Sequence, residues 1–315
     1  MPRHPDPERE ADCAAPIRVV RIIARLNIGG PAIQAITLTQ RLRSRGYATR
    51  LVRGTEGAQE GSMDDLAVAL GVAPTWLRAM RRDPGIGDLR AVLMLARMLR
   101  RDQPQIVHTH AAKGGTLGRA AVLLAFGRRR PILVHTFHGH SLTGYFASRT
   151  ARVYTIVERV LARSTDVLVA VSPEVRDDLV GLRIAPAARF EVVPLGFDLS
   201  AFLDDEDRAR RRGLLRAAWG FGPDDEVVTL VARLVPIKRA DRFLEVAELL
   251  ADRPRARFVV VGDGELGAQL RASSAALSLG DRLHWAGFRR DMHDVCVASD
   301  VVVLTSDNEG TPVSL

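Results

Sequence analysis

The chain has 315 residues, enough for two domains, because a single core usually stops growing at about 250–300 residues. Hydrophobic residues make up 47% and charged residues 26%, and the mean hydropathy is +0.01. These values exclude a largely disordered chain, a collagen and a multi-span membrane protein. No apolar run approaches the roughly 18–20 residues that a membrane helix needs.

The net charge of +8 and the pI near 10.5 raise the question of a nucleic-acid partner. Two observations argue against one: the arginines are scattered along the chain, and aromatic residues make up only 5%, too few for a base-stacking surface. We expect no nucleic-acid partner, and a weak peripheral attraction to anionic membrane instead. Lys113 and Lys238 are the only lysines among 45 basic residues, so each is informative.

Residues 1–16 are polar, proline-rich and acidic, which predicts a disordered tail rather than a signal peptide. From residue 17 to 196, short β-branched runs alternate with amphipathic stretches. The predicted strands are 19–24, 48–52, 106–108, 132–136 and 167–171, and the predicted helices include 33–45, 89–99, 117–124 and 153–161. Near-continuous apolar strands separated by helices indicate a parallel sheet covered on both faces.

In residues 197–222 the composition becomes highly charged and then rich in turn-forming residues, which predicts a linker region. After it, the alternation of strands and helices begins again. The second set of predicted strands is 227–232, 257–261, 282–285 and 301–304, with helices at 241–250, 266–279 and 292–298. The predicted fold is therefore α/β, with two Rossmann-like doubly wound parallel-sheet domains, 17–196 and 223–315, that face a cleft. Ligands in such sheets bind outside the carboxyl ends of the strands.

The second domain is about half as long as the first and stops in the first turn of an expected helix. A doubly wound sheet that closed there would leave an open edge and an uncovered face. We therefore expect the second domain to be incomplete and the chain to be a fragment. The two cysteines, Cys13 and Cys296, form no disulfide framework and fit a reducing, cytoplasmic compartment.

Two loops of the first domain carry candidate site residues. Gly29 and Gly30 lie between the first strand and the first helix, where free amides favour a phosphate, although a tight turn explains two glycines equally well. Five histidines fall in VHTHAAKGG (107–115) and VHTFHGH (134–140). Such histidine pairs are common metal ligands. However, no carboxylate lies near them in sequence, and successive side chains of a strand point to opposite faces of the sheet. We expect His135 to be a core histidine and one or two others to be functional without binding metal.

Three loops of the second domain add polar groups. Arg233 and Lys238 flank a proline-containing turn and can converge on a polyphosphate, the arginine as a bidentate donor and the lysine as a point charge. Gly262 and Asp263 end the next strand, where an ordinary turn explains them as well. Glu309 stands before Gly310 and Thr311, whose amides could bind hydroxyl or phosphate oxygens at a helix start.

Together, motifs spread over nearly the whole chain resemble glycosyltransferase family four, retaining enzymes of GT-B fold that use nucleotide-diphosphate sugars. Those motifs occur in the order Gly29-Gly30, VHTFHGH, VSPEVRDDL, VVPLGFD, ARLVPIK, VGDGE, WAGFRRDM and SDNEGTPVSL. The VHTHAAKGGTLGR and VHTFHGHSLTGYF segments are similar to members that assemble bacterial exopolysaccharides or related glycoconjugates. The resemblance implies a UDP- or GDP-sugar donor, a glycan or lipid-linked acceptor and no tightly bound metal.

The resemblance also implies roles for individual residues. Arg233 and Lys238 would bind the diphosphate and stabilise it as it leaves, His138 would lie beside the donor sugar, and Glu309 would contact sugar hydroxyls. The other residues implied to contact the donor are Gly29, Gly30, Gly262, Asp263, Phe288, Arg289, Gly310 and Thr311, with Phe288 and Arg289 near the nucleobase. Two cations placed where negative charge develops agree with electrostatic transition-state stabilisation.

One departure concerns the family's second glutamate, which would fall eight residues after Glu309, whereas the chain ends six residues after it. We expect this chain to be a weak or inactive piece of an active enzyme, and turnover equal to that of an extended version would contradict this. Three alternatives remain open: a sugar-nucleotide 2-epimerase of the same fold, a metallohydrolase built on the histidines, and a non-catalytic nucleotide-sugar binding module.

Overall fold

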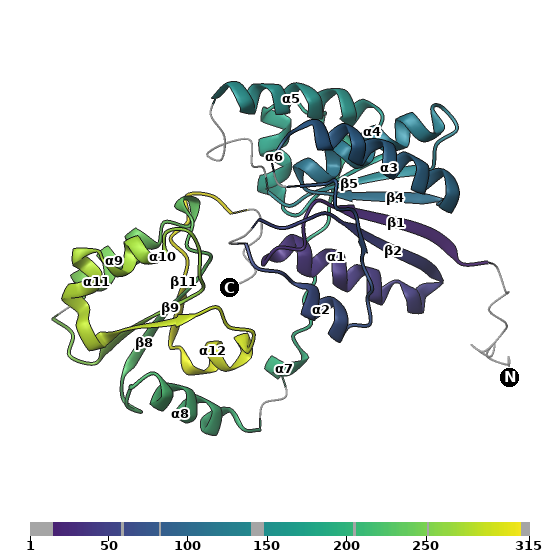
Figure 1. Ribbon diagram of the computed structural model, residues 1–315. Coiled ribbons are helices and arrows are strands. Elements are labelled where there is room, and N and C mark those ends of the chain that lie inside the picture. The colour runs from purple at the N-terminus through teal and green to yellow at the C-terminus, as the bar shows by residue number, and fades with distance from the viewer. Residues whose placement is uncertain are drawn as a thin grey trace, which may run out of the picture.

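The computed structural model describes residues 15–57, 60–81, 83–139, 148–203, 206–250 and 252–309. Its strands form two parallel sheets, one in each half of the chain, which confirms the predicted α/β class with two Rossmann-like units (Figure 1). No helix within these ranges is long and apolar enough to span a membrane.

The first sheet has seven strands in the order β3-β2-β1-β4-β5-β6-β7. They are β1 (Ile17–Ile23), β2 (Tyr47–Arg53), β3 (Thr75–Trp76), β4 (Ile106–His110), β5 (Ile132–Phe137), β6 (Val167–Ala170) and β7 (Phe190–Val192). All neighbouring pairs are parallel, and the register places Arg21 beside His108 and His110 beside Thr136.

Helices cover the first sheet on both faces, with α1 and α2 on one side and α3, α4 and α5 on the other (Figure 1). They are α1 (Gly30–Arg41), α2 (Asp64–Ala69), α3 (Ile86–Asp102), α4 (Ala112–Phe126), α5 (Ser148–Arg163) and α6 (Pro173–Gly181). Apolar side chains of alternating strand positions fill the two layers: Val20 and Ile22 pack toward α3 and α4, whereas Ile23 and Leu51 pack toward α1 and α2. This alternation sets which side chains can meet at the ends of the strands.

The second sheet has four strands in the order β10-β9-β8-β11. Its strands are β8 (Glu226–Val231), β9 (Ala256–Val261), β10 (Leu283–Gly287) and β11 (Val301–Val303). The helices of this half are α7 (Ser200–Leu203), α8 (Arg208–Ala218), α9 (Ala240–Leu249), α10 (Gly267–Arg271), α11 (Ser274–Leu279) and α12 (Met292–Ala298). Short 3₁₀ turns complete the chain: η1 (Arg43–Arg45), η2 (Ala187–Arg189), η3 (Pro236–Lys238) and η4 (Gly280–Arg282).

Two segments differ from the sequence reading. The predicted single helix 266–279 is two helices, because Ser273 caps a new start by accepting a hydrogen bond from the amide of Ala276. The predicted linker 197–222 contains α8, which packs against the second sheet through Leu215, with Trp219 and Phe221 just after it. The run of arginines on the outer face of α8 conceals this apolar side in the sequence.

Candidate functional site

The candidate residues gather at the carboxyl edges of the two sheets. Gly29 and Gly30 follow β1, His138 follows β5, Arg233 follows β8, Gly262 follows β9, Phe288 follows β10 and Glu309 follows β11. An ion pair joins Arg290, after β10, to Asp65, after β2. Because each partner lies beyond the carboxyl end of a parallel strand, this pair shows that the two carboxyl edges approach each other.

The start of α1 offers backbone amides. Gly29 is the N-cap residue with φ of 152°, a region that favours glycine, and the buried Gly30 begins the helix. No described side chain caps these amides. Helix starts of this kind favour anions, and an anion bound at this one stays a prediction of the sequence.

Lys238 and Glu309 meet at the carboxyl edge of the second sheet. The Lys238 ammonium donates to Glu309 Oε1 at 2.5 Å, and the Ser306 hydroxyl donates to the same oxygen at 2.6 Å. Arg233 is half-buried on the same loop as Lys238, and no described group forms a hydrogen bond or ion pair with its side chain. The loop thus holds one cation with a carboxylate partner and one cation that is available to a ligand.

Gly262 and Asp263 contact the backbone of the loop that carries Arg233 and Lys238. The amide of Leu234 donates to the carbonyl of Asp263 at 3.0 Å, and the amide of Leu266 donates to the carbonyl of Leu234 at 3.0 Å. A Cβ on Gly262 would lie 1.9 Å from the carbonyl oxygen of Ala232. The structure therefore places Gly262 and Asp263 against the backbone that carries Arg233.

Two residues that the sequence reading missed hold the same loop from the other side. The Thr305 hydroxyl donates to the carbonyl of Arg239 at 2.8 Å and lies 3.2 Å from that of Lys238. Asp307 pairs with Arg242 at 2.7 Å, and its amide donates to the carbonyl of Ile237 at 2.9 Å. The only signal in the sequence was a polar run directly after a strand.

Phe288 and Arg289 follow β10. Phe288 is 42% exposed, and the guanidinium carbon of Arg290 lies 5.8 Å from its ring centroid. The Arg289 guanidinium is held by Asp291, with Nε 2.9 Å from Oδ1. Phe288 thus presents an exposed ring, whereas the Arg289 guanidinium is already paired with the Asp291 carboxylate.

The histidines divide between the two faces of the first sheet. His135 is fully buried on the α4 side, where its Nδ1 lies 2.9 Å from the Thr109 hydroxyl, so it is the core histidine that the sequence predicts. On the α1 side, the rings of His108 and His110 lie 4.1 Å apart, and His110 Nδ1 is 2.9 Å from His138 Nε2. His138 is thus tied to its own sheet.

Burial keeps the histidines neutral. It lowers the pKa of His138 to about 4, and it is the first cause that holds the pKa of His108, His110 and His135 well below the ordinary value. Within the described ranges, no three histidine, cysteine or acidic side chains form a cluster that could hold a metal ion. The metallohydrolase alternative therefore lacks a ligand set in this part of the chain.

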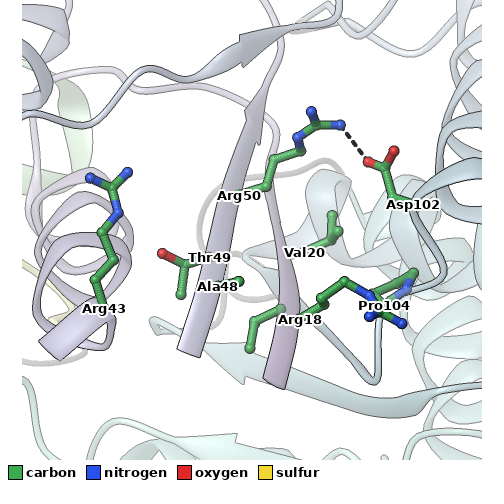
Figure 2. Close-up of a pocket in the computed structure, with 9 residues that line it drawn as sticks. Arg18, Val20, Arg43, Ala48, Thr49, Arg50, Asp102 and Pro104 are labelled. Atoms are coloured by element: carbon green, nitrogen blue, oxygen red, sulfur yellow. Dashed lines mark hydrogen bonds and ion pairs between the residues drawn. The ribbon is translucent and has the colours of Figure 1, made fainter. Parts of the chain in front are cut away.

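A surface groove of about 460 Å³ lies at the opposite edge of the first sheet (Figure 2). It is lined at the amino ends of β1 and β2, where Arg50 pairs with Asp102 and Arg18 donates to the carbonyl of Gln103 at 2.8 Å. Its arginines are used by the protein itself, and it lies away from the candidate loops. Gly310, Thr311, His140 and residues 1–14 of the predicted tail lie outside the described residues.

Comparison with known proteins supports the resemblance. The model of Glycosyltransferase Family 4 matches residues 28–201, and the model of Glycosyl transferases group 1 matches residues 212–315. The first match covers more than half of the chain. The chain belongs to glycosyltransferase family 4.

Individual relatives agree with this family. The chain is 32% identical, over 73% of its length, to UDP-Gal:alpha-D-GlcNAc-diphosphoundecaprenol alpha-1,3-galactosyltransferase of Escherichia coli, of which it covers 59%. It is 30% identical, over 65% of its length, to D-inositol 3-phosphate glycosyltransferase of Actinosynnema mirum, of which it covers 51%. The chain thus spans between half and three fifths of the length of these two relatives.

Among solved structures, HepE of Anabaena in complex with UDP-glucose has a similar fold. The TM-score is 0.73 at 21% identity, and the match covers 93% of this chain and 75% of HepE. This likeness supports the GT-B architecture that the resemblance implies.

Proposed function

We propose that this family 4 chain carries the donor-diphosphate site of a retaining glycosyltransferase that moves a hexose from a nucleotide-diphosphate sugar to a hydroxyl acceptor. The observation that carries the proposal is the loop of Arg233 and Lys238 at the carboxyl edge of the second sheet. One of its cations has no partner in the described chain, and the other is paired with Glu309. A diphosphate needs such convergent positive charge.

In the proposed reaction, the bond between the sugar's anomeric carbon and the diphosphate oxygen breaks, and the acceptor hydroxyl oxygen forms its bond to that carbon from the same face, with its proton passing to the departing diphosphate. The diphosphate then gains negative charge, which Arg233 and Lys238 stabilise. Glu309 accepts hydrogen bonds from the sugar hydroxyls, and His138 lies near the sugar. Gly29 and Gly30 face the phosphates, and Phe288 and Arg289 lie near the base. We propose that the reaction needs no tightly bound metal ion.

The names of two similar proteins support this choice of substrate. The Escherichia coli relative is named for a UDP-sugar donor and a diphosphoundecaprenol-linked acceptor, and HepE was solved with UDP-glucose. We therefore propose a UDP- or GDP-sugar donor and a glycan or lipid-linked acceptor, in polysaccharide or glycoconjugate synthesis. The family match does not favour the 2-epimerase alternative.

Proton NMR of UDP-α-hexoses incubated with the chain tests the reaction, with water as the stand-in acceptor. We expect slow release of UDP and a free sugar that appears first as the α-anomer, and we expect Lys238→Ala to stop the release. A sugar that appears first as the β-anomer would contradict retention. A nucleotide sugar with inverted C2 and no UDP release would favour the epimerase.

We further propose that the protein works at the cytoplasmic face of the plasma membrane, through the outer face of α3 and α5. Val153, Ile156 and Val160 of α5 are 55–60% exposed, and Ile86 of α3 is 94% exposed. Arginines accompany them: Arg90, Arg97, Arg152 and Arg163. The acidic residue of α5, Glu158, is buried, and those of α3, Asp88 and Asp102, are paired with Lys113 and Arg50. The unpaired charge around this apolar face is therefore mainly positive, which suits anionic lipid.

Sedimentation with phosphatidylglycerol vesicles at low salt tests this contact. We expect the chain to sediment and the triple variant Val153→Ser/Ile156→Ser/Val160→Ser to stay in solution. The control removes exposed apolar residues of the second half, Val246→Ser/Leu249→Ser/Leu277→Ser, and should sediment like the original chain. Equal sedimentation of both variants, or none by the original chain, would contradict the proposal.

A further inference from the structure

The start of α9 carries two more arginines directly after the loop of Arg233 and Lys238. Arg239 precedes the helix as its N-cap, and Arg242 lies in its first turn. Arg239 has φ of 47°, in the left-handed region that residues with a side chain adopt only where the surroundings hold them. The groups that hold these two arginines therefore shape the loop that carries the site cations.

Two carboxylates bind the two arginines. Asp241, on α9 itself, accepts from Arg239 Nη2 at 2.7 Å and from its Nε at 3.0 Å. Asp307, in the segment after β11, has Oδ1 2.7 Å from Arg242 Nη1 and 3.4 Å from Arg239 Nη1. Of the two carboxylates, Asp307 is the one that joins the segment after β11 to the start of α9.

Asp307 stands two residues before Glu309 and is held at both its backbone and its side chain. Its amide donates to the carbonyl of Ile237 at 2.9 Å, in addition to the two guanidinium contacts. The side chain of Asp307 is 41% exposed, so each ion pair alone contributes little to stability. Several bonds between the same two segments nevertheless fix the path of the chain toward Glu309, which contacts Lys238.

The charge of Asp307 makes its removal informative. An alanine at this position keeps the backbone amide that bonds to Ile237 and removes one negative charge from the neighbourhood of Arg233 and Lys238. Less negative charge near these cations favours an anion such as a diphosphate. Loss of the carboxylate should therefore disturb the placement of Glu309 without weakening the attraction of the loop for phosphate.

We propose that Asp307 is a positioning residue that ties the segment after β11 to the start of α9 and so keeps Glu309 in contact with Lys238, where it can meet the sugar of the donor. The contact with the sugar rests on the proposed function. The placement of Glu309 against Lys238 does not, and it can be measured without a nucleotide.

The presence of only two lysines in the chain makes this placement observable. In the chain labelled with ¹³C,¹⁵N-lysine, NMR that detects Nζ through the neighbouring CH₂ protons gives one signal each for Lys113 and Lys238. Lys238→Arg assigns the signals, and Glu309→Gln shows where Lys238 appears without its carboxylate partner. We expect Asp307→Ala to move the Lys238 signal toward that position. Asp307→Asn keeps an oxygen acceptor and should move it less.

Asp241→Ala is the matched control, because it removes a carboxylate from the same Arg239 and leaves the segment after β11 untouched. It should leave the Lys238 signal in place. Lys113, which pairs with Asp88 at 2.8 Å in the other half of the chain, should not move in any variant. A Lys238 signal that is unchanged in Asp307→Ala, that moves equally in Asp241→Ala, or that coincides with that of Glu309→Gln in the original chain would overturn the proposal.

Calorimetry separates positioning from a purely structural role. We expect Asp307→Ala to bind UDP at least as tightly as the original chain. We expect the ratio of UDP-hexose affinity to UDP affinity to fall about 2- to 10-fold, the effect of one hydrogen bond, with UDP-glucose and UDP-galactose as the probes. Asp307→Asn should recover part of this loss, and Asp241→Ala should leave the ratio unchanged.

Two results would overturn the positioning role: a UDP affinity that falls together with that for the sugar nucleotide, which indicates collapse of the loop, or a ratio that does not change. A different result would count against the proposed function alone. In that case the Lys238 signal moves as expected in Asp307→Ala, but neither UDP nor a UDP-hexose binds the original chain.

Discussion

At the scale of single residues, Gly262 has the tightest backbone contact of the candidate site. Its φ is 135°, and any Cβ would lie 1.9 Å from the carbonyl oxygen of Ala232, at the start of the Arg233 loop. We expect Gly262→Ala to lower the free energy of unfolding by about 2–4 kcal/mol, because strain and clash act together. Urea unfolding followed by circular dichroism measures this.

The control for this prediction is Gly181→Ala at the end of α6, where a Cβ meets no atom within 4 Å. That change should be neutral or stabilise by up to about 1 kcal/mol, because alanine favours a helix over glycine. Equal stability of the two variants would show that the backbone near Gly262 relaxes freely.

The sequence predicts some site residues better than others. Arg233 and Lys238 could be found because Lys238 is one of only two lysines and both residues flank a turn after a strand. The contacts of Thr305 with the Lys238 loop could not be found, because its partners are backbone carbonyls 66–67 residues away. The bond between His110 and His138 likewise depends on strand register, which the sequence does not reveal.

At the scale of elements, a buried ion pair fastens α5 to α4. The side chains of Arg119 and Glu158 are 0% and 3% exposed, and Nη2 lies 2.5 Å from Oε2. Burial raises the pKa of Glu158 against the opposing effect of Arg119. The pair therefore fixes the position of α5 relative to α4.

We expect Arg119→Met to lower the free energy of unfolding by about 3–5 kcal/mol, because it leaves a buried carboxylate without its partner. The double variant Arg119→Met/Glu158→Leu should recover most of the loss. Arg210→Met, which breaks an exposed pair with Asp207, is the control and should cause no measurable change. A single Arg119→Met variant as stable as the control would show that the pair contributes nothing to folding.

Periodicity predicted most of the longer elements, and local chemistry explains the exceptions. A side-chain cap sets the new helix start at Ser273, and Leu215, together with Trp219 and Phe221 just after the helix, sets how α8 packs on the sheet. Short strands such as β3, with two residues, carry too little pattern to be recognised. Because residues 208–212 are mostly arginine, the sequence predicted a linker where the structure has α8.

At the scale of the whole molecule, the buried neutral histidines make stability depend on pH. Their pKa values are lowered in the folded state, so between about pH 4 and 6.5 the unfolded chain binds more protons and stability falls as the pH falls. Each buried histidine should lower the free energy of unfolding by about 1 kcal/mol between pH 7 and 5.5, and the four together by about 4–5 kcal/mol.

Urea unfolding at pH 7.5, 6.5 and 5.5 measures this slope, and His108→Asn should reduce it by about one quarter. The raised pKa of Glu158 acts in the opposite direction, since protonation of that buried carboxyl favours the folded state at low pH. A free energy of unfolding that does not change over this range would show that the histidines are accessible to protons in the folded chain.

The two-sheet architecture was predictable because near-continuous apolar strands separated by helices leave few other topologies, and the ordered motifs pointed to the same family. The approach of the two carboxyl edges, marked by the pair of Arg290 and Asp65, was not predictable from periodicity. It depends on two exposed side chains that lie 225 positions apart in the chain.

Calorimetry of UDP, GDP and ADP binding tests the central claim, that the Arg233 and Lys238 loop is a diphosphate site. We expect UDP or GDP to bind the original chain and the control Arg253→Ala/Arg255→Ala, which removes two positive charges at the amino edge of the same sheet. Arg233→Ala/Lys238→Ala should lose at least about tenfold in affinity, the effect of removing charge-assisted hydrogen bonds. Nucleotide binding that survives this double change undiminished would contradict the account.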